Sequence, residues 1–201
     1  MEKVKDCSLA AFRKQLEAYI PYNEQEEKDK KLMLGCLAMG DAVLTRESTG
    51  AHMSASAWVV NKAHDKVLMA YHNIYDSWAW TGGHADGEWD FLGVAVREVM
   101  EETGVTKVIP VSGDIFSLEV LTVDGHEKHG TYVSSHLHLN VTYLLEADEN
   151  EAIRKKADEN SSVGWFGLEE CLTAVSEPWM RDRIYRKLLD KMKIFIPSAV
   201  N

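Results

Sequence analysis

The stretch from Gly82 to Val105 decides the fold, and it reads GGHADGEWDFLGVAVREVMEETGV. Apolar residues recur at helical spacing over 91–99, which predicts a helix with one face packed under a sheet. Asp90 is placed to cap the start of this helix, and Gly104 is placed to end it. The loop before the helix is rich in glycine, so its backbone N–H groups can approach a bound ligand closely.

Three glutamates share one face of the predicted helix, because Glu98, Glu101 and Glu102 are related as i, i+3 and i+4. Like charges at this spacing repel by about a few tenths of a kcal/mol per pair, and the helix dipole also opposes negative charge near the C-terminus. Arg97 can offset part of this repulsion. A hard divalent cation such as Mg²⁺ or Mn²⁺ would turn the repulsion into binding. A solvated acidic face is the alternative on helix composition alone.

The residues around these glutamates resemble the Nudix box, in which Gly, five residues, Glu and seven residues precede Arg-Glu-apolar-x-Glu-Glu-x-Gly-apolar. The second half of this pattern is present in full over 97–105. The resemblance extends over about residues 52–172 and includes KVLMAYH and WFGLEE. One position departs from the pattern: counted back from Arg97, the first Glu of the box falls on Trp89. Glu88 has the right spacing from Gly82 and stands one residue earlier.

The resemblance implies an α/β fold of the Nudix type, an α/β/α sandwich with a mixed sheet. It also implies Mg²⁺-dependent hydrolysis, with Mn²⁺ able to substitute, of a diphosphate linkage in a nucleoside diphosphate derivative or a related organic pyrophosphate. By carry-over, Glu98, Glu101 and Glu102 are the catalytic residues and metal ligands, with Glu98 alternatively the base. Arg97 is expected to orient the glutamates. The family often takes a further acid from outside the box, and Glu159 is the candidate here.

The expected substrate contacts lie in the glycine loop and in a later strand: Gly82, Gly83, His84, Trp80, His136 and His138. His84 directly follows two glycines and is placed to contact phosphate. His136 and His138 alternate along a predicted strand and therefore share a face. We expect them to line a polar pocket, and a separate transition-metal site is the alternative. Trp80 offers a face for stacking, while packing of the loop and core is the alternative for the Trp-rich segment.

Patterns outside the box predict a helical N-terminal extension over 1–45 and a Nudix domain over 46–201 that ends in a helix. The extension contains two predicted helices, over 8–20 and 24–44, the first capped by Ser8. A turn-like KAHD separates the first two strands, and a polar loop is predicted over 124–130. The remaining strands and helices are predicted at 52–61, 66–72, 107–123, 131–146 and 162–167, and at 148–157, 168–175 and 179–193.

Composition limits the partners and the location of the protein. The 201 residues carry a formal net charge of −10, which disfavours nucleic-acid polymers and leaves a small diphosphate molecule as the expected partner. Three cysteines without zinc spacing indicate reduced thiols and a cytoplasmic protein. The N-terminus does not resemble a signal peptide, and the longest apolar stretch is too short to span a bilayer. By resemblance to the family, a homodimer is possible.

Two other functions are compatible with the sequence. A Nudix fold that binds a nucleotide or acts as a regulator without turnover would explain the departure at Trp89. Isopentenyl-diphosphate isomerase shares the fold, but its chemistry needs a cysteine at the substrate carbon. The nearest cysteines to the box, Cys36 and Cys171, are distant from it in the sequence.

Overall fold

The computed structural model describes residues 6–128, 130–156 and 159–196, and it divides into two compact units. Three long elements contribute to both units: β1 (Ala51–Val60), α3 (Phe91–Thr103) and β9 (His136–Ala147). Each unit is described by itself. Unit 1 comprises Met1–Ser56, Gly82–Ala95 and Gly113–Tyr143, and unit 2 comprises Ala57–Thr81, Val96–Ser112 and Leu144–Asn201.

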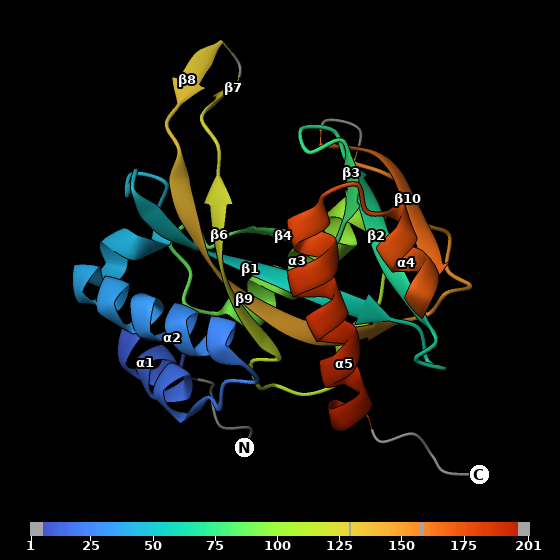
Figure 1. Ribbon diagram of the computed structural model, residues 1–201, viewed down its shortest axis with the longest axis horizontal. Helices are drawn as coiled ribbons and strands as arrows, with labels where there is room; N and C mark the ends of the chain where they lie inside the picture. The colour runs from blue at the N-terminus through green and yellow to red at the C-terminus, as the bar shows by residue number, and fades with distance from the viewer. Residues whose placement is uncertain (1–5, 129, 157–158, 197–201) are drawn as a thin grey trace. The chain divides into compact units, whose positions relative to one another are not determined.

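Unit 1 contains the first parts of β1 and β9. Strand β4 (Thr81–His84) pairs with β1, and β6 (Ser117–Val123) pairs antiparallel with β9. The predicted polar loop over 124–130 is wrong in part, because 126–128 form strand β7, which pairs with β8 (Thr131–Val133) in a separate ribbon (Figure 1). The strand predicted over 131–146 is accordingly interrupted between β8 and β9.

The N-terminal part of unit 1 is helical, as predicted. Helix α1 (Leu9–Ala18) begins after Ser8, whose hydroxyl oxygen accepts the N–H of Ala11 at 3.2 Å, which confirms the predicted cap. Helix α2 (Glu24–Cys36) is shorter than the predicted helix over 24–44. Its continuation is the 3₁₀ segment η1 (Leu37–Leu44), which is kinked at Gly40 with φ +60°. An α-helix cannot continue through a positive φ, and glycine adopts that conformation without steric cost.

A chain of buried polar side chains connects α2 to the strands of unit 1. The carboxylate of Glu26 is fully buried, and it accepts the Tyr19 hydroxyl at 2.6 Å and the Ser117 hydroxyl at 2.8 Å. Ser117 also contacts the buried carboxylate of Glu119. Since buried charges are costly unless they are hydrogen-bonded, these contacts fix the position of α2 on β6.

Asn140 of β9 extends the same network to β1. Its Oδ1 accepts the hydroxyls of Ser54 at 3.1 Å and Ser56 at 2.9 Å. Its Nδ2 donates to Glu119 and to Thr142, both at 3.1 Å. Asn140 is 1% exposed, so water cannot replace these bonds if the side chain is removed.

Replacement of Asn140 by alanine should lower the free energy of unfolding by about 2–3 kcal/mol, because several buried polar groups lose their partner together. Urea denaturation of both proteins measures this difference. Asn150→Ala is the matched control, since Asn150 is exposed and should change stability by less than about 0.5 kcal/mol. Equal losses in the two variants would contradict the role of Asn140.

Trp89, which stands at the first Glu position of the box, packs against the N-terminal extension. Its ring centroid lies 5.9 Å from the rings of both Phe12 and Phe91, and those two rings are 4.6 Å apart. Its Nε1–H donates to Asp41 of η1 at 2.9 Å. Within unit 1, Trp89 therefore links the start of α3 to α1 and η1.

Trp89→Ala should destabilise the protein by about 2 kcal/mol, because it removes a large apolar contact area together with the bond to Asp41. Trp89→Phe keeps a ring against Phe12 and Phe91 and should lose less than half of that amount. Chemical denaturation of the two variants measures the difference. The packing role is wrong if the alanine variant is as stable as the unmodified protein.

Unit 2 contains the other strands of the sheet together with the second parts of β1 and β9. The strand order is β10-β2-β1-β9-β5, and β3 (Ser77–Ala79) pairs with β2. Strand β2 (Lys66–His72) has the predicted bounds. Strands β3 and β4 were not predicted, because no strand was assigned to the Trp-rich segment and the glycine loop before α3. The region predicted as one strand over 107–123 contains β5 (Val108–Pro110) in this unit and β6 in the other. The other elements of this unit are β10 (Asn160–Gly167), α4 (Leu168–Ala174), the π-helical segment η2 (Met180–Tyr185) and α5 (Arg186–Phe195).

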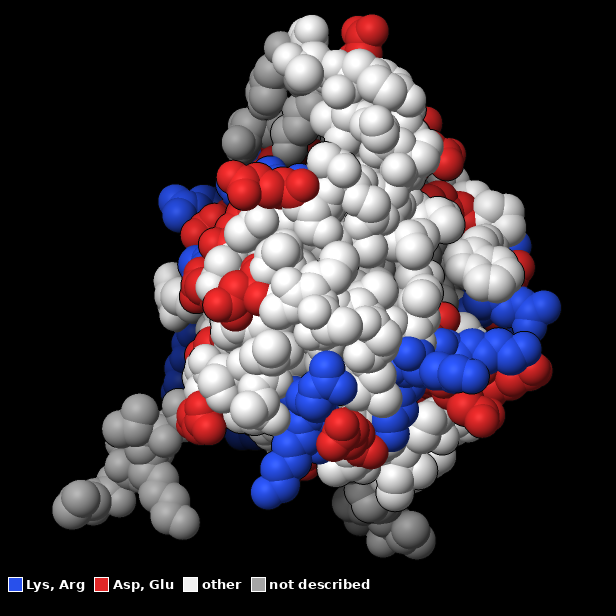
Figure 2. All heavy atoms as spheres, turned by 90° about the vertical axis from the view of Figure 1, so that its left-hand side faces the viewer, with Lys and Arg blue, Asp and Glu red and all other residues white. Residues whose placement is uncertain are grey.

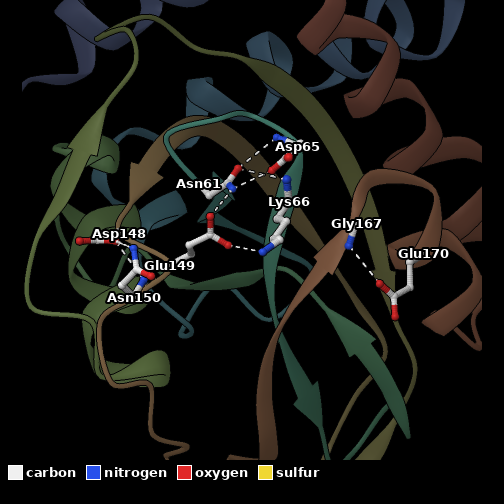
Figure 3. Close-up of polar contacts among 8 residues, drawn as sticks. All are labelled: Asn61, Asp65, Lys66, Asp148, Glu149, Asn150, Gly167 and Glu170. Carbon is white, nitrogen blue, oxygen red and sulfur yellow. Dashed lines mark hydrogen bonds and ion pairs between the residues drawn. The ribbon is translucent and has the colours of Figure 1, made fainter.

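The predicted turn between β1 and β2 is present and is held by Asn61. Its Oδ1 accepts the N–H groups of Asp65 at 3.0 Å and Lys66 at 3.1 Å, as Figure 3 shows. Its Nδ2 donates to Asp65 at 2.8 Å and to Glu149 at 2.9 Å. Glu149 also pairs with the Lys66 ammonium. These contacts attach the segment after β9 to the β1–β2 turn.

The helix predicted over 148–157 is wrong for 148–156, and residue 157 lies outside the described residues. Asp148 Oδ1 accepts both the backbone and the side-chain N–H of Asn150 at 2.9 Å, which makes a turn (Figure 3). The N–H of Arg154 donates to the carbonyl of Thr103 at 2.7 Å. The backbone N–H of Arg154 therefore bonds to the end of α3 and is not available for a hydrogen bond within a local helix.

The face drawn in Figure 2 carries both acidic and basic side chains, and in its lower half the basic side chains lie next to acidic ones. Of the helices in the described ranges, none has the length and apolarity that a membrane span requires.

Candidate functional site

The three box glutamates lie on the last turns of α3, in unit 2, and they differ in exposure. Glu102 is 5% exposed, whereas the side chain of Glu101 is 49% exposed and Glu98 is half-buried. Gly104 ends the helix with φ +75°, and a Cβ at this position would collide with Arg154. Gly104 therefore stops α3 directly after the acids, as the sequence predicted.

Glu159 is connected to the box glutamates by the side chain of Lys156, which contacts both Glu159 and Glu101. The Lys156 ammonium is 3.0 Å from Glu159 Oε2 and 3.6 Å from Glu101 Oε2. Asn160 positions this segment, because its Oδ1 accepts the N–H of Lys156 at 3.0 Å and its Nδ2 donates to the carbonyl of Glu102 at 3.4 Å. The structure thus brings together Glu101 and Glu159, which the sequence separates widely. Lys156 is a participant that the sequence reading missed.

Burial and neighbouring charges shift the pKa values of Glu98 and Lys156 in this acid cluster. Burial raises the pKa of Glu98, and the neighbouring charge of Glu101 raises it further, while Lys156 and Arg97 oppose the increase. Burial lowers the pKa of Lys156, but its hydrogen bond to Glu159 and the nearby glutamates outweigh burial and raise that pKa overall. Carboxylate oxygens are the donors that Mg²⁺ and Mn²⁺ prefer, so the chemical type of these side chains suits a hard divalent cation.

The glycine loop belongs to unit 1, where β4 lies against β1. A Cβ at Gly82 would lie 2.5 Å from Ser56 Oγ and 2.7 Å from the Ala55 carbonyl oxygen, so only glycine fits. Close strand packing is therefore a reason for glycine here, in addition to the predicted contact of Gly82 and Gly83 with phosphate. Gly87 has φ +97°, a conformation that also favours glycine.

Unit 1 brings His84, His136 and His138 together, and it adds His52, which the sequence reading missed. The Nε2 atom of His138 lies 3.2 Å from the Nε2 atoms of both His84 and His136. The His52 ring centroid lies 4.8–5.1 Å from the other three. No signal in the sequence links His52 to these residues, since the contact depends on strand pairing. His126 instead contacts the carbonyl of Asp124, and His129 lies outside the described residues.

The tryptophans of the link are packed against other aromatic residues. The Trp80 ring lies edge-on to Tyr185 at 5.5 Å, and its backbone N–H donates to the Tyr185 hydroxyl at 3.2 Å. Trp78 lies edge-on to Phe166 at 4.6 Å and to Tyr71 at 5.5 Å. These contacts favour the packing interpretation for Trp78 and Trp89, and stacking of Trp80 on a substrate stays a prediction.

The cysteines are free thiols, as predicted, and they differ in exposure. Cys171 is buried on α4, where its thiol donates to the carbonyl of Leu168 at 3.0 Å. Burial raises the pKa of Cys171 to about 12, so the thiolate is not accessible at neutral pH. This environment gives no support to the isomerase alternative.

Comparison with known proteins agrees with the box. A family model for the NUDIX domain matches residues 50–189. Diphosphoinositol polyphosphate phosphohydrolase 3-alpha of Mus musculus is 30% identical over 136 residues, which cover 67% of this chain and 73% of that protein. Diphosphoinositol polyphosphate phosphohydrolase 2 of Homo sapiens is 29% identical over the same length, with 67% and 66% covered.

A solved structure has the same fold. A hydrolase of the NUDIX family from Clostridium perfringens aligns with a TM-score of 0.51 at 19% identity, covering 71% of this chain and 97% of that one. This similarity confirms the predicted Nudix-like α/β fold with a mixed sheet. Because the family model covers well over half of the sequence and the second half of the box is present in full, the chain belongs to the Nudix family and is a Nudix-type hydrolase.

Proposed function

We propose that the protein hydrolyses a diphosphate linkage in a small organic molecule and depends on Mg²⁺, with Mn²⁺ able to substitute. The observation that supports this most is the grouping of Glu98, Glu101, Glu102 and Glu159 around the end of α3 and Lys156. A cluster of this kind is unfavourable without a cation. Its donor atoms are those that hold a hard divalent ion next to phosphate oxygens.

Glu101, Glu102 and Glu159 would hold the ion, with Glu98 a further ligand. When bound, the ion supplies positive charge to the diphosphate and to the leaving oxygen. Glu98 alternatively takes the proton of the attacking water, a role that suits a carboxylate with a raised pKa. Water then forms the new P–O bond while the bond to the leaving phosphate group breaks. Arg97 orients the glutamates.

The remaining assignments concern the substrate. We propose that the backbone of Gly82 and Gly83 and the ring of His84 contact phosphate, and that Trp80, His136 and His138 contact the organic group. The relatives are named as phosphohydrolases of diphosphoinositol polyphosphates, so that class joins nucleoside diphosphate derivatives as a candidate substrate. A homodimer and a cytoplasmic location remain predictions from the sequence.

Glu102→Gln should reduce the rate of phosphate release at least tenfold, because a buried metal-ligating oxygen is replaced by a neutral amide. The measurement is product release from nucleoside diphosphate derivatives, dinucleoside polyphosphates and diphosphoinositol polyphosphates, with Mg²⁺ and with Mn²⁺. Glu169→Gln is the matched control, since Glu169 is an exposed acid in the first turn of α4, and it should retain full activity. A loss below tenfold in Glu102→Gln on every active substrate would contradict the mechanism.

Glu159→Gln should raise the Mn²⁺ concentration for half-maximal activity severalfold, with most of the activity restored at saturating metal. The reason is that Glu159 is exposed and contributes charge through its pair with Lys156, whereas Glu102 is buried. Metal titration of activity in both variants separates the two residues. Unchanged metal dependence in Glu159→Gln would remove Glu159 from the set of ligands.

Binding without turnover is the second candidate function, and one observation favours it. Trp89 occupies the first Glu position of the box and is engaged with Phe12, Phe91 and Asp41. A ligand that raises the melting temperature but is not consumed with either metal, over the same panel of compounds, would select this function over hydrolysis.

A further inference from the structure

We propose that His52, His84 and His138 form a site for a transition-metal ion, with Zn²⁺ as the expected ion and His136 adjacent to it. Among the described residues, one ring nitrogen from each of the three can be chosen so that all lie within 4.8 Å of one another. None of the box glutamates belongs to this group. The site is therefore separate in its residues from the acid cluster and goes beyond the proposed hydrolysis.

The distance between two of the three proposed ligands, His84 and His138, matches that of an imidazole-bound ion, and His52 contributes a nitrogen within 4.8 Å of both. Ligand nitrogens at 2.0–2.1 Å from a tetrahedral Zn²⁺ ion are separated by about 3.3 Å. The Nε2 atoms of His84 and His138 are 3.2 Å apart, and those of His136 and His138 are also 3.2 Å apart. Only a proton or a cation between two such ring nitrogens makes a short approach of this kind favourable.

The backbone of unit 1 supports this arrangement. His52 lies on β1, His84 ends β4, and His136 and His138 begin β9, two residues apart and therefore on one face. Since β1 and β9 are neighbours in the sheet and β4 pairs with β1, the rings are held on paired strands. Sites built on strands keep their geometry better than sites on loops.

Backbone carbonyls select the tautomer that leaves Nε2 available. His52 Nδ1 lies 3.1 Å from the carbonyl oxygen of Ser48, and His136 Nδ1 lies 2.7 Å from that of Ser134. Because a carbonyl only accepts, both Nδ1 atoms carry a proton, and in the neutral form of each ring Nε2 then carries the lone pair. This is the support that metal-ligating histidines usually have. His52 Nε2 is buried, and no hydrogen-bond partner for it occurs among the described residues.

The type of donor also suits a transition-metal ion. The neighbouring charged groups are Arg46 and Asp86, which pair at 2.7 Å. Neutral imidazoles are the form that binds metals, and imidazole favours Zn²⁺, Cu²⁺ or Ni²⁺ over Mg²⁺. This preference distinguishes the site from the carboxylates of α3.

The test is metal binding by the full chain after chelator treatment, with Zn²⁺ in calorimetry and Co²⁺ as an optical probe of imidazole coordination. We expect one equivalent bound by the unmodified protein and by Glu102→Gln. His138→Ala and His52→Ala should weaken binding at least about tenfold and lose the Co²⁺ bands. His126→Ala is the matched control on the β7–β8 ribbon and should bind normally.

The results separate this site from the proposed active site. Loss of Zn²⁺ binding in Glu102→Gln with retention in His138→Ala would place the ion at the acids and overturn the proposal, as would no Zn²⁺ binding at all. Circular dichroism verifies that each variant is folded. If a buried-site variant does not fold, the half-buried His84→Ala replaces it, and unchanged Zn²⁺ affinity in that variant overturns the proposal equally.

Discussion

Repulsion among the glutamates at the end of α3 is the constraint on which the rest of unit 2 depends. The helix places Glu98, Glu101 and Glu102 on one face, where both their mutual repulsion and the helix dipole oppose them. Lys156 offsets part of this repulsion by pairing with Glu101 and Glu159 at the surface. Because a surface ion pair contributes little stabilisation, much of the repulsion remains, and a bound cation would reduce it.

The departure from the box pattern has a structural reason in unit 1. Trp89 stands where the family has its first glutamate, and its contacts with Phe12 and Asp41 connect the N-terminal extension to the start of α3. The position thus serves packing. The buried network from Glu26 to Asn140 attaches the extension to the strands independently, through polar contacts that water cannot replace.

Local patterns explain which elements the sequence predicted. Helix α3 and strand β2 have the predicted bounds because the apolar pattern lies inside them, while the capping and turn residues stand directly at their ends. Strand β4 was missed because it becomes a strand only by pairing with β1, which is distant in the sequence. Strands β3 and β7 pair with the neighbouring strands β2 and β8, but three residues are too few to show the alternation of a strand. The helix predicted over 148–157 is absent over 148–156, where the N–H of Arg154 is bonded to Thr103, a residue that is distant in the sequence.

The two clusters of candidate ligands differ in how far the sequence could reveal them. The acids of α3 are neighbours within one helix, so their spacing already shows that they share a face. His52, His84 and His138 come from three strands, and only the pairing of β4 and β9 with β1 brings their nitrogens together. The donor types also differ, because oxygen donors suit Mg²⁺ and imidazole nitrogens suit Zn²⁺.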